Sequence, residues 1–290
     1  MANTVSNVFV QTFETNVRHL AQQTQSMLRH TVMEKSVQSE KHNWEILGTI
    51  EASDKTTRLV ATPVQDTPWS RRVSVPVTFH AGDSSEQEDI VQMLVDPNSN
   101  ITQALAAAMR RRIDDKIIAA ATGTALDGAG AANAFPAGQV VGNGTTKISF
   151  DMVTEVQEVF MANNIDPSVP KFFVVGPKQV RKLMQLTQQT SSDYVNAQAL
   201  QQLNATGIVP NWMGFTWILS TRLLAPGVGE LSCLAYTGKA LGLQVNKDIN
   251  ARVAEDPSVS FAWRIYCHAT MGAIRVEDEQ IVHAHVLDSV

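Results

Sequence analysis

The sequence has few cysteines, no long apolar run and no signal-like N-terminus, and each shortage excludes a class of protein. Only two cysteines occur among 290 residues, Cys233 and Cys267, and their spacing fits neither a zinc knuckle nor a redox CxxC pair. We predict that both are buried thiols. Apolar stretches such as Ile117–Ala121 are far shorter than the roughly 20 residues that cross a bilayer. Without a basic start and an apolar core at the N-terminus, folding in the cytoplasm without a membrane partner is expected.

An excess of positive charge is also missing. The formal net charge is −5 and the pI is near 5.8, which argues against a dominant basic face that grips DNA. The run Arg110–Arg112 is followed by Asp114 and Asp115 at a spacing of four residues. On a helix this spacing predicts local ion pairs, so the run indicates a solvated or inter-subunit face.

Catalytic signatures are absent as well. Gly238–Ala240 resembles the end of a phosphate-binding loop, but Cys233 stands where the first glycine is required. Gly128–Gly130 lacks the third glycine of a dinucleotide loop. No GxSxG or HExxH motif occurs, and His283 with His285 is better explained as a structural pair than as a metal site. The sequence therefore predicts no catalytic residue, no cofactor and no metal.

The first third of the chain contains a polar segment and two strand-like stretches. Met1–Lys41 is polar, with apolar residues at helical spacing near its start, and predicts an arm that docks on another surface. Residues 44–52 and 73–79 alternate with the period of a strand, and Pro76 favours an edge position for the second. Such a two-stranded flap needs a surface to lie on. Either it packs on its own domain, or it reaches across a neighbouring subunit.

The rest of the sequence predicts an α+β protein. A long helix is expected over residues 100–121, followed by an irregular glycine- and alanine-rich loop over 122–144. A mixed α/β unit follows, with a helix capped by Ser149 and another that starts at Pro177. The remaining predictions are a polar exposed segment over 185–203 and strands at 172–175, 215–220, 231–236, 241–245, 261–271 and 272–287.

The order of these parts resembles the major capsid proteins of tailed bacteriophages, which have the Hong Kong 97 fold. The phrases Thr62–Arg72, Gly207–Phe215 and Trp263–Arg275 strengthen the resemblance, which covers nearly the whole chain. It implies five parts. These are an N-terminal arm (1–42), an extended β-hairpin loop (43–92), a peripheral domain (93–148) with a spine helix at 100–121, a largely axial α/β domain (149–256), and return strands of the peripheral domain (257–290).

The resemblance implies self-assembly into hexamers and pentamers that form an icosahedral head around the phage genome. Trp69 would dock on the spine region of an adjacent subunit, and Arg58, Arg71 and Arg72 would meet acidic partners there. A separate scaffolding protein, a portal protein and a decoration protein are the further partners, and the DNA would be enclosed without sequence-specific binding. The mature protein would reside in the virion after assembly in the host cytoplasm.

Two alternatives stay open at this point. The first is a bacterial encapsulin-like nanocompartment shell, which shares the fold but packages an enzyme, although no cargo-peptide groove is evident. The second is an α/β enzyme built around residues 149–245, which would need a nucleophile or a phosphate loop at a strand end. The sequence supplies neither.

Overall fold

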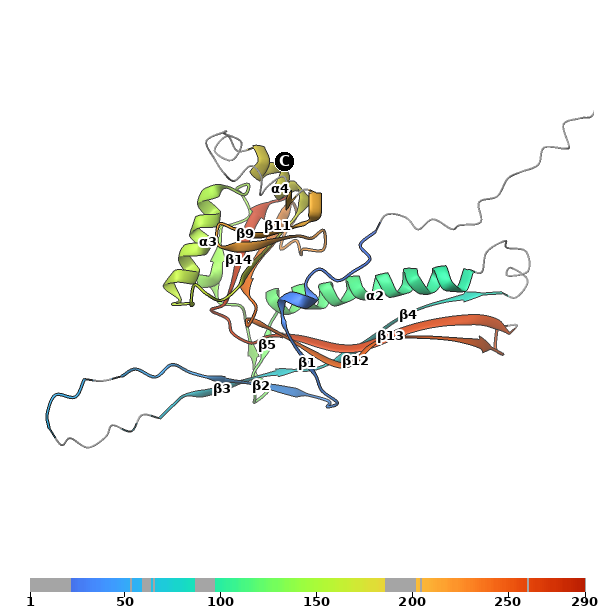
Figure 1. Cartoon of the computed structure of the whole chain (residues 1–290), viewed down its shortest axis with the longest axis horizontal. Helices are drawn as coiled ribbons and strands as arrows, with labels where there is room; N and C mark the ends of the chain where they lie inside the picture. The colour runs from blue at the N-terminus through green and yellow to red at the C-terminus, as the bar shows by residue number, and fades with distance from the viewer. Residues whose placement is uncertain are drawn as a thin grey trace, which may run out of the picture.

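A computed structural model shows an elongated molecule in which one long helix lies between two sheets and a hairpin projects to one side (Figure 1). The predicted helical contacts of the N-terminal arm, the Thr62–Pro63 part of the loop and most of the 185–203 segment lie outside the described residues. The structure describes residues 22–52, 54–58, 64, 66–86, 97–185, 202–203, 205–259 and 261–289.

A six-stranded mixed sheet forms the α/β unit. Its strand order is β7-β14-β11-β8-β10-β9, with parallel pairing between β10 and β8 and between β14 and β7. The strands are β7 (Val140–Val141), β8 (Lys171–Val175), β9 (Ile208–Trp212), β10 (Phe215–Leu219), β11 (Glu230–Thr237) and β14 (Ile281–Leu287). Buried residues on both faces of β8 and β11 indicate a sheet that is covered on both sides.

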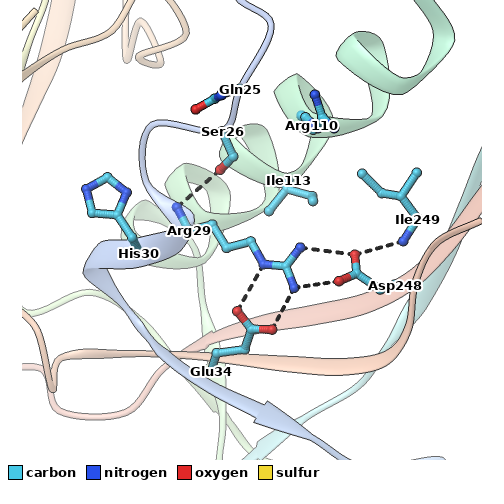
Figure 2. Close-up of a pocket in the computed structure, with 9 residues that line it drawn as sticks. All are labelled: Gln25, Ser26, Arg29, His30, Glu34, Arg110, Ile113, Asp248 and Ile249. Carbon is cyan, nitrogen blue, oxygen red and sulfur yellow. Dashed lines mark hydrogen bonds and ion pairs between the residues drawn. The ribbon is translucent and has the colours of Figure 1, made fainter. Parts of the chain in front are cut away.

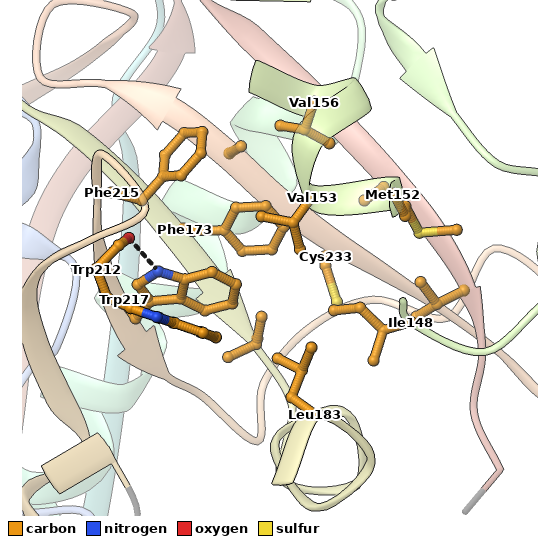
Figure 3. Packing of buried hydrophobic residues seen from close by; sticks show 14 of the residues in the cluster. Ile148, Met152, Val153, Val156, Phe173, Leu183, Trp212, Phe215, Trp217 and Cys233 are labelled. Atoms are coloured by element: carbon orange, nitrogen blue, oxygen red, sulfur yellow. Dashed lines mark hydrogen bonds between the residues drawn. The ribbon is translucent and has the colours of Figure 1, made fainter. Parts of the chain in front are cut away.

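Helices α3 (Phe150–Ala162) and α4 (Pro177–Gln185) cover one face of this sheet. As predicted, the Ser149 hydroxyl caps α3 by accepting a hydrogen bond from the Met152 amide at 3.2 Å, and Pro177 begins α4. Aromatic residues fill the core beneath them, where the rings of Phe173 and Trp217 stack with centroids 4.5 Å apart (Figure 3). Their complete burial makes this the rigid part of the unit.

A second, four-stranded sheet has the order β1-β12-β13-β4. Its strands are β1 (Met33–Ser36), β4 (Val77–Ser85), β12 (Leu241–Asp256) and β13 (Ala262–Arg275). The predicted strand at 241–245 is only the start of β12, whose outer part is exposed and therefore lacks an apolar pattern. The predicted strand at 272–287 is wrong, because β13 ends at Arg275 and β14 belongs to the other sheet. The boundary expected between 256 and 257 thus does not follow the sheets.

Helix α2 (Pro97–Thr122) confirms the predicted long helix and lies between the two sheets. Met109, Ile113 and Ile117 are at most 2% exposed, as their four-residue spacing predicts. The cluster that contains them includes Tyr236 of the six-stranded sheet and Met271 of the four-stranded sheet. Both sheets therefore share one core with α2.

The projecting hairpin consists of β2 (His42–Leu47) and β3 (Trp69–Ser74), paired in antiparallel register. The predicted strand at 44–52 overlaps β2 but ends too late, and the predicted strand at 73–79 runs across the end of β3 and the start of β4. Both faces of β3 are largely exposed and give no alternating pattern. Pro76 lies between β3 and β4 and so belongs to neither strand, although β4, which begins at the next residue, is an edge strand. Residues 49–52 and 54–58 are all exposed, so the described part of the loop beyond β2 does not pack on its own domain. The predicted irregular loop contains β5 (Ala125–Leu126), β6 (Ala132–Asn133) and the 3-10 helix η3 (Ala137–Gln139).

Candidate assembly surfaces

The base of the extended loop is fixed to the four-stranded sheet by Trp44. Its indole is 7% exposed and donates a hydrogen bond to the Ser74 hydroxyl at 3.1 Å, which donates in turn to the Gln244 side-chain oxygen at 2.7 Å. Gly242 of β12 lets the ring approach, since a Cβ there would lie 2.7 Å from the indole. The hairpin therefore leaves the body from a packed base.

A buried ion cluster holds the same base from the other side. Asp278 accepts hydrogen bonds from Arg72 of β3 at 2.9 Å and from Arg275 of β13 at 2.5 Å. Arg275 is completely buried and also donates to the carbonyl of Gly123 at 2.6 Å and to the carbonyl of Asn133 at 3.1 Å. One carboxylate thus joins the extended loop to the end of β13, and the guanidinium of Arg275 joins both to the loop after α2.

The four residues predicted to contact a neighbour lie in two environments. Arg58 is exposed in the projecting loop, and Trp69 is 70% exposed opposite Leu47, which is 56% exposed. Arg71 forms a 2.7 Å ion pair with Glu45 across the hairpin, with both side chains close to half exposed. Arg72 has its acidic partner within the chain, as described above. Contacts of these four residues with another subunit stay predictions.

The N-terminal segment docks on α2 through a carboxylate that is 1% exposed. Asp114 accepts hydrogen bonds from the amides of Met27 at 3.1 Å and Leu28 at 3.2 Å, and from the Ser26 hydroxyl at 2.5 Å. The segment continues into the short 3-10 helix η2 (Arg29–Thr31) and then into β1. A single buried charge in the middle of α2 therefore fixes the start of the described chain.

The ion pairs predicted for Arg110 and Arg111 at a spacing of four residues are not formed, whereas Arg112 forms a local pair with Asp115 at 3.7 Å. Arg110 donates to the carbonyl of Thr24 at 3.0 Å, and Arg111 donates to the carbonyl of Gln23 at 3.0 Å. Asp115 instead forms a bidentate pair with Arg222 at 2.5 and 2.7 Å, which raises the pKa of Arg222. Arg110 and Arg111 therefore bind the backbone of the arm instead of the carboxylates that helix spacing suggested.

A hollow of about 700 Å³ lies between this segment, α2 and β12 (Figure 2). Arg29 lies in it and bonds to two carboxylates, with Glu34 at 2.6 and 2.9 Å and Asp248 at 2.8 and 3.0 Å. The hydrogen bonds that Arg29 donates to Glu34 and then to Asp248 raise the pKa of Arg29, and the bond to Asp248 lowers the pKa of Asp248. The charges of Arg29, Glu34 and Asp248 are thus paired within the chain, and these pairs hold the arm against β12.

The two cysteine thiols and the His283 imidazole, which could carry chemistry, are packed in the protein interior. Cys233 and Cys267 are buried as predicted, and burial raises the pKa of Cys233 to about 12. His283 stacks on Phe135 at 3.7 Å, its Nε2 lies 3.2 Å from the Ala121 carbonyl, and burial lowers its pKa to about 4. Within the described ranges no group of three potential ligands could hold a metal, and no helix is long and apolar enough to span a membrane.

A comparison with protein families identifies the chain. A family model described as phage capsid protein matches residues 5–287. The chain belongs to the phage capsid protein family. A capsid protein is a structural component of the virion, and the predicted function is thereby confirmed in preference to the nanocompartment and enzyme alternatives. Among curated protein sequences, none matches the chain significantly.

Solved structures confirm the capsid fold. A protein of Mycobacterium phage Che8 is similar over 97% of this chain and 98% of its own, at 15% identity and a TM-score of 0.72. The capsid of cyanophage P-SCSP1u is similar over 100% and 96%, at 13% identity and a TM-score of 0.76. The capsid of Ralstonia phage GP4 is similar over 99% and 98%, at 8% identity and a TM-score of 0.76. The Hong Kong 97-like fold predicted from the order of parts therefore agrees with the phage capsid structures over the whole chain.

The assembly surfaces contain residues that sequence reasoning missed. Asp278 and Arg275 were not recognised as a cluster, although Arg275 follows the uncharged run Met271–Ile274 and precedes the acidic run Glu277–Glu279, which offers it carboxylate partners. Asp114 was identified only as a surface partner of Arg110. No local signal could have shown that its partners lie more than 80 residues away, with Leu28 at a separation of 86.

Proposed function

We propose that this capsid protein assembles into rings of six and five that close into an icosahedral head around the phage genome. The observation that carries this proposal is an extended loop whose described residues 49–52 and 54–58 are all exposed, on a base fixed by Trp44 and by the Arg72–Asp278–Arg275 cluster. A fixed base with an exposed loop suits a segment whose packing surface belongs to another copy.

The loop offers an apolar patch and a cation to that neighbour. Trp69 and Leu47 form the patch on paired positions of β3 and β2, and Arg58 lies farther out in the loop. Arg71 and Arg72 already pair with Glu45 and Asp278, so a further carboxylate on a neighbour would add less to their binding. We therefore expect Trp69 and Arg58 to contribute most of the contact, and Arg72 to act mainly in holding the base.

Further partners and the place of assembly follow from the same proposal. A separate scaffolding protein and a portal protein direct closure in the host cytoplasm, a decoration protein stabilises the finished shell, and DNA is enclosed without sequence-specific contacts. The net charge of −5 supports enclosure without a dominant basic face. We assign no catalytic activity to the chain, since its thiols and His283 lie in buried packing environments.

Electron microscopy of the purified chain tests the proposal, with and without a co-expressed candidate scaffolding protein. The wild type is expected to form closed shells, tubes or rings. The Trp69→Ala variant should stay folded and lose assembly, because it removes most of the apolar patch, whereas Trp69→Phe should retain it. Size-exclusion chromatography and circular dichroism separate loss of assembly from loss of folding. A wild type that stays monomeric or dimeric under both conditions would refute the shell function.

A further inference from the structure

Hydrogen bonds join the described residues of the turn between β12 and β13, at the outer end of the four-stranded sheet. Pairing of the two strands continues to Asp256 and Ala262. The Asp256 carboxylate accepts from the Ser258 amide at 3.0 Å and from Arg264 at 2.8 Å, and the Ala262 amide donates to the Val259 carbonyl at 2.8 Å. These bonds make the turn a defined shape rather than a loose connection.

Phe261 occupies an unusual position in this turn. Its φ angle is +57°, in the left-handed region that favours glycine, and its side chain is 57% exposed. Val253 and Val259 near the same end are 45% and 49% exposed. Neither backbone preference nor burial within the chain accounts for an aromatic residue here, so the strain indicates a role for the exposed ring.

A hollow of about 580 Å³ lies on the same end of the sheet, on the side that α2 does not cover. The Tyr266 ring and the Arg264 guanidinium form part of its wall, with Arg264 paired to Asp256 at 2.8 Å. Strand β4 contributes His80, Gly82, Asp83 and Ser84. An aromatic wall beside a guanidinium suits an incoming aromatic ring. Phe261 does not line this hollow in its own chain.

We infer that Phe261 of one copy enters this hollow on a neighbouring copy of the same chain. Each chain carries one projecting ring and one hollow at the same end, and the two do not meet within the chain. A contact between two different surfaces repeats from copy to copy and closes into a ring when the rotation allows. This inference rests on the proposed shell function and adds a second contact, at the opposite end of the molecule from the extended loop (Figure 1).

Substitution of Phe261 separates its role in assembly from any role in folding. Phe261→Gly relieves the left-handed strain, so the melting temperature of the unassembled chain should be unchanged or higher. Loss of the ring should weaken the affinity of each contact by roughly ten- to a hundredfold and lower the shell yield. Phe261→Leu should retain part of that affinity. If the wild type forms shells and Phe261→Gly forms them with the same yield and stability, this inference alone is overturned. Failure of the wild type to assemble would overturn the proposed function.

Disulfide trapping identifies the partner of the ring. Shells are assembled from a mixture of Phe261→Cys and Ser84→Cys chains, and their oxidised products are compared with those of each variant alone. Because each chain carries only one new thiol and the native cysteines are buried, a linked dimer in the mixture alone requires contact between two copies. Intact shells without this dimer, or a dimer from Phe261→Cys alone, would overturn the proposed docking of the ring in the hollow. Intact shells without the linked dimer are also expected if another protein covers Phe261.

Discussion

Replacing Asp278 with asparagine should destabilise the chain far more than an equivalent change on the surface. The substitution keeps the size of the side chain but removes the charge between Arg72 and Arg275. Arg275 is 0% exposed, so its charge loses the one carboxylate that pairs with it among the described residues, without access to water. Removing one partner of a buried ion pair costs about 3–5 kcal/mol, a large share of the roughly 5–15 kcal/mol that stabilises a typical domain.

Glu45→Gln is the matched control, because it is also an acid-to-amide change in an ion pair of the same hairpin. The pair of Glu45 with Arg71 has side chains that are 44% and 49% exposed, so its loss should cost only about 0.2–1 kcal/mol. Denaturant unfolding of the unassembled chains, followed by tryptophan fluorescence, measures both free energies. Equal free energies of unfolding for the two variants would refute the argument that the buried charge needs Asp278. A partial recovery on adding Arg275→Met would support it further.

Three further outcomes are expected. Gly242→Ala should lower the free energy of unfolding by about 1–3 kcal/mol, since its Cβ would lie 2.7 Å from the Trp44 indole, whereas Gly138→Ala meets no atom within 4 Å and should be neutral in the same denaturation assay. His283 has a pKa of about 4 when folded and 6.5 ordinarily, so protonation favours the unfolded chain. Stability should therefore fall by up to about 3 kcal/mol as the pH drops from 6.5 to 4, and His283→Gln should flatten this dependence in a pH series of melts. Asp114→Ala should speed hydrogen exchange at the Met27 and Leu28 amides, and Asp115→Ala should not; unchanged exchange in the first variant would contradict the docking role of Asp114.

Sequence reasoning succeeded where the determining contacts are local. The Ser149 cap, the start of α4 at Pro177 and the buried stripe of α2 all depend on residues within a few positions of one another. Helical periodicity reports such contacts directly. The core-facing strands β8 and β11 were found for a similar reason, because burial on both faces leaves a continuous apolar run.

The same reasoning failed where a segment distant in the sequence binds a side chain in place of its helical neighbours. Helix spacing paired Asp114 with Arg110, but backbone amides of the N-terminal segment bind the carboxylate instead. Strand β3 was missed because no core lies against most of it, so selection for alternating apolar residues is absent there. Assembly surfaces are hard to read from one chain for this reason, since what constrains their residues lies on another copy.

The position of α2 limits where a shell of these subunits can change its curvature. Its buried side chains belong to a cluster that contains residues of both sheets, so neither sheet can turn against the other without opening that core. Differences in angle between adjacent copies must then be absorbed outside the cluster. In the proposed shell, the exposed part of the extended loop beyond its fixed base is the segment free to take up such differences.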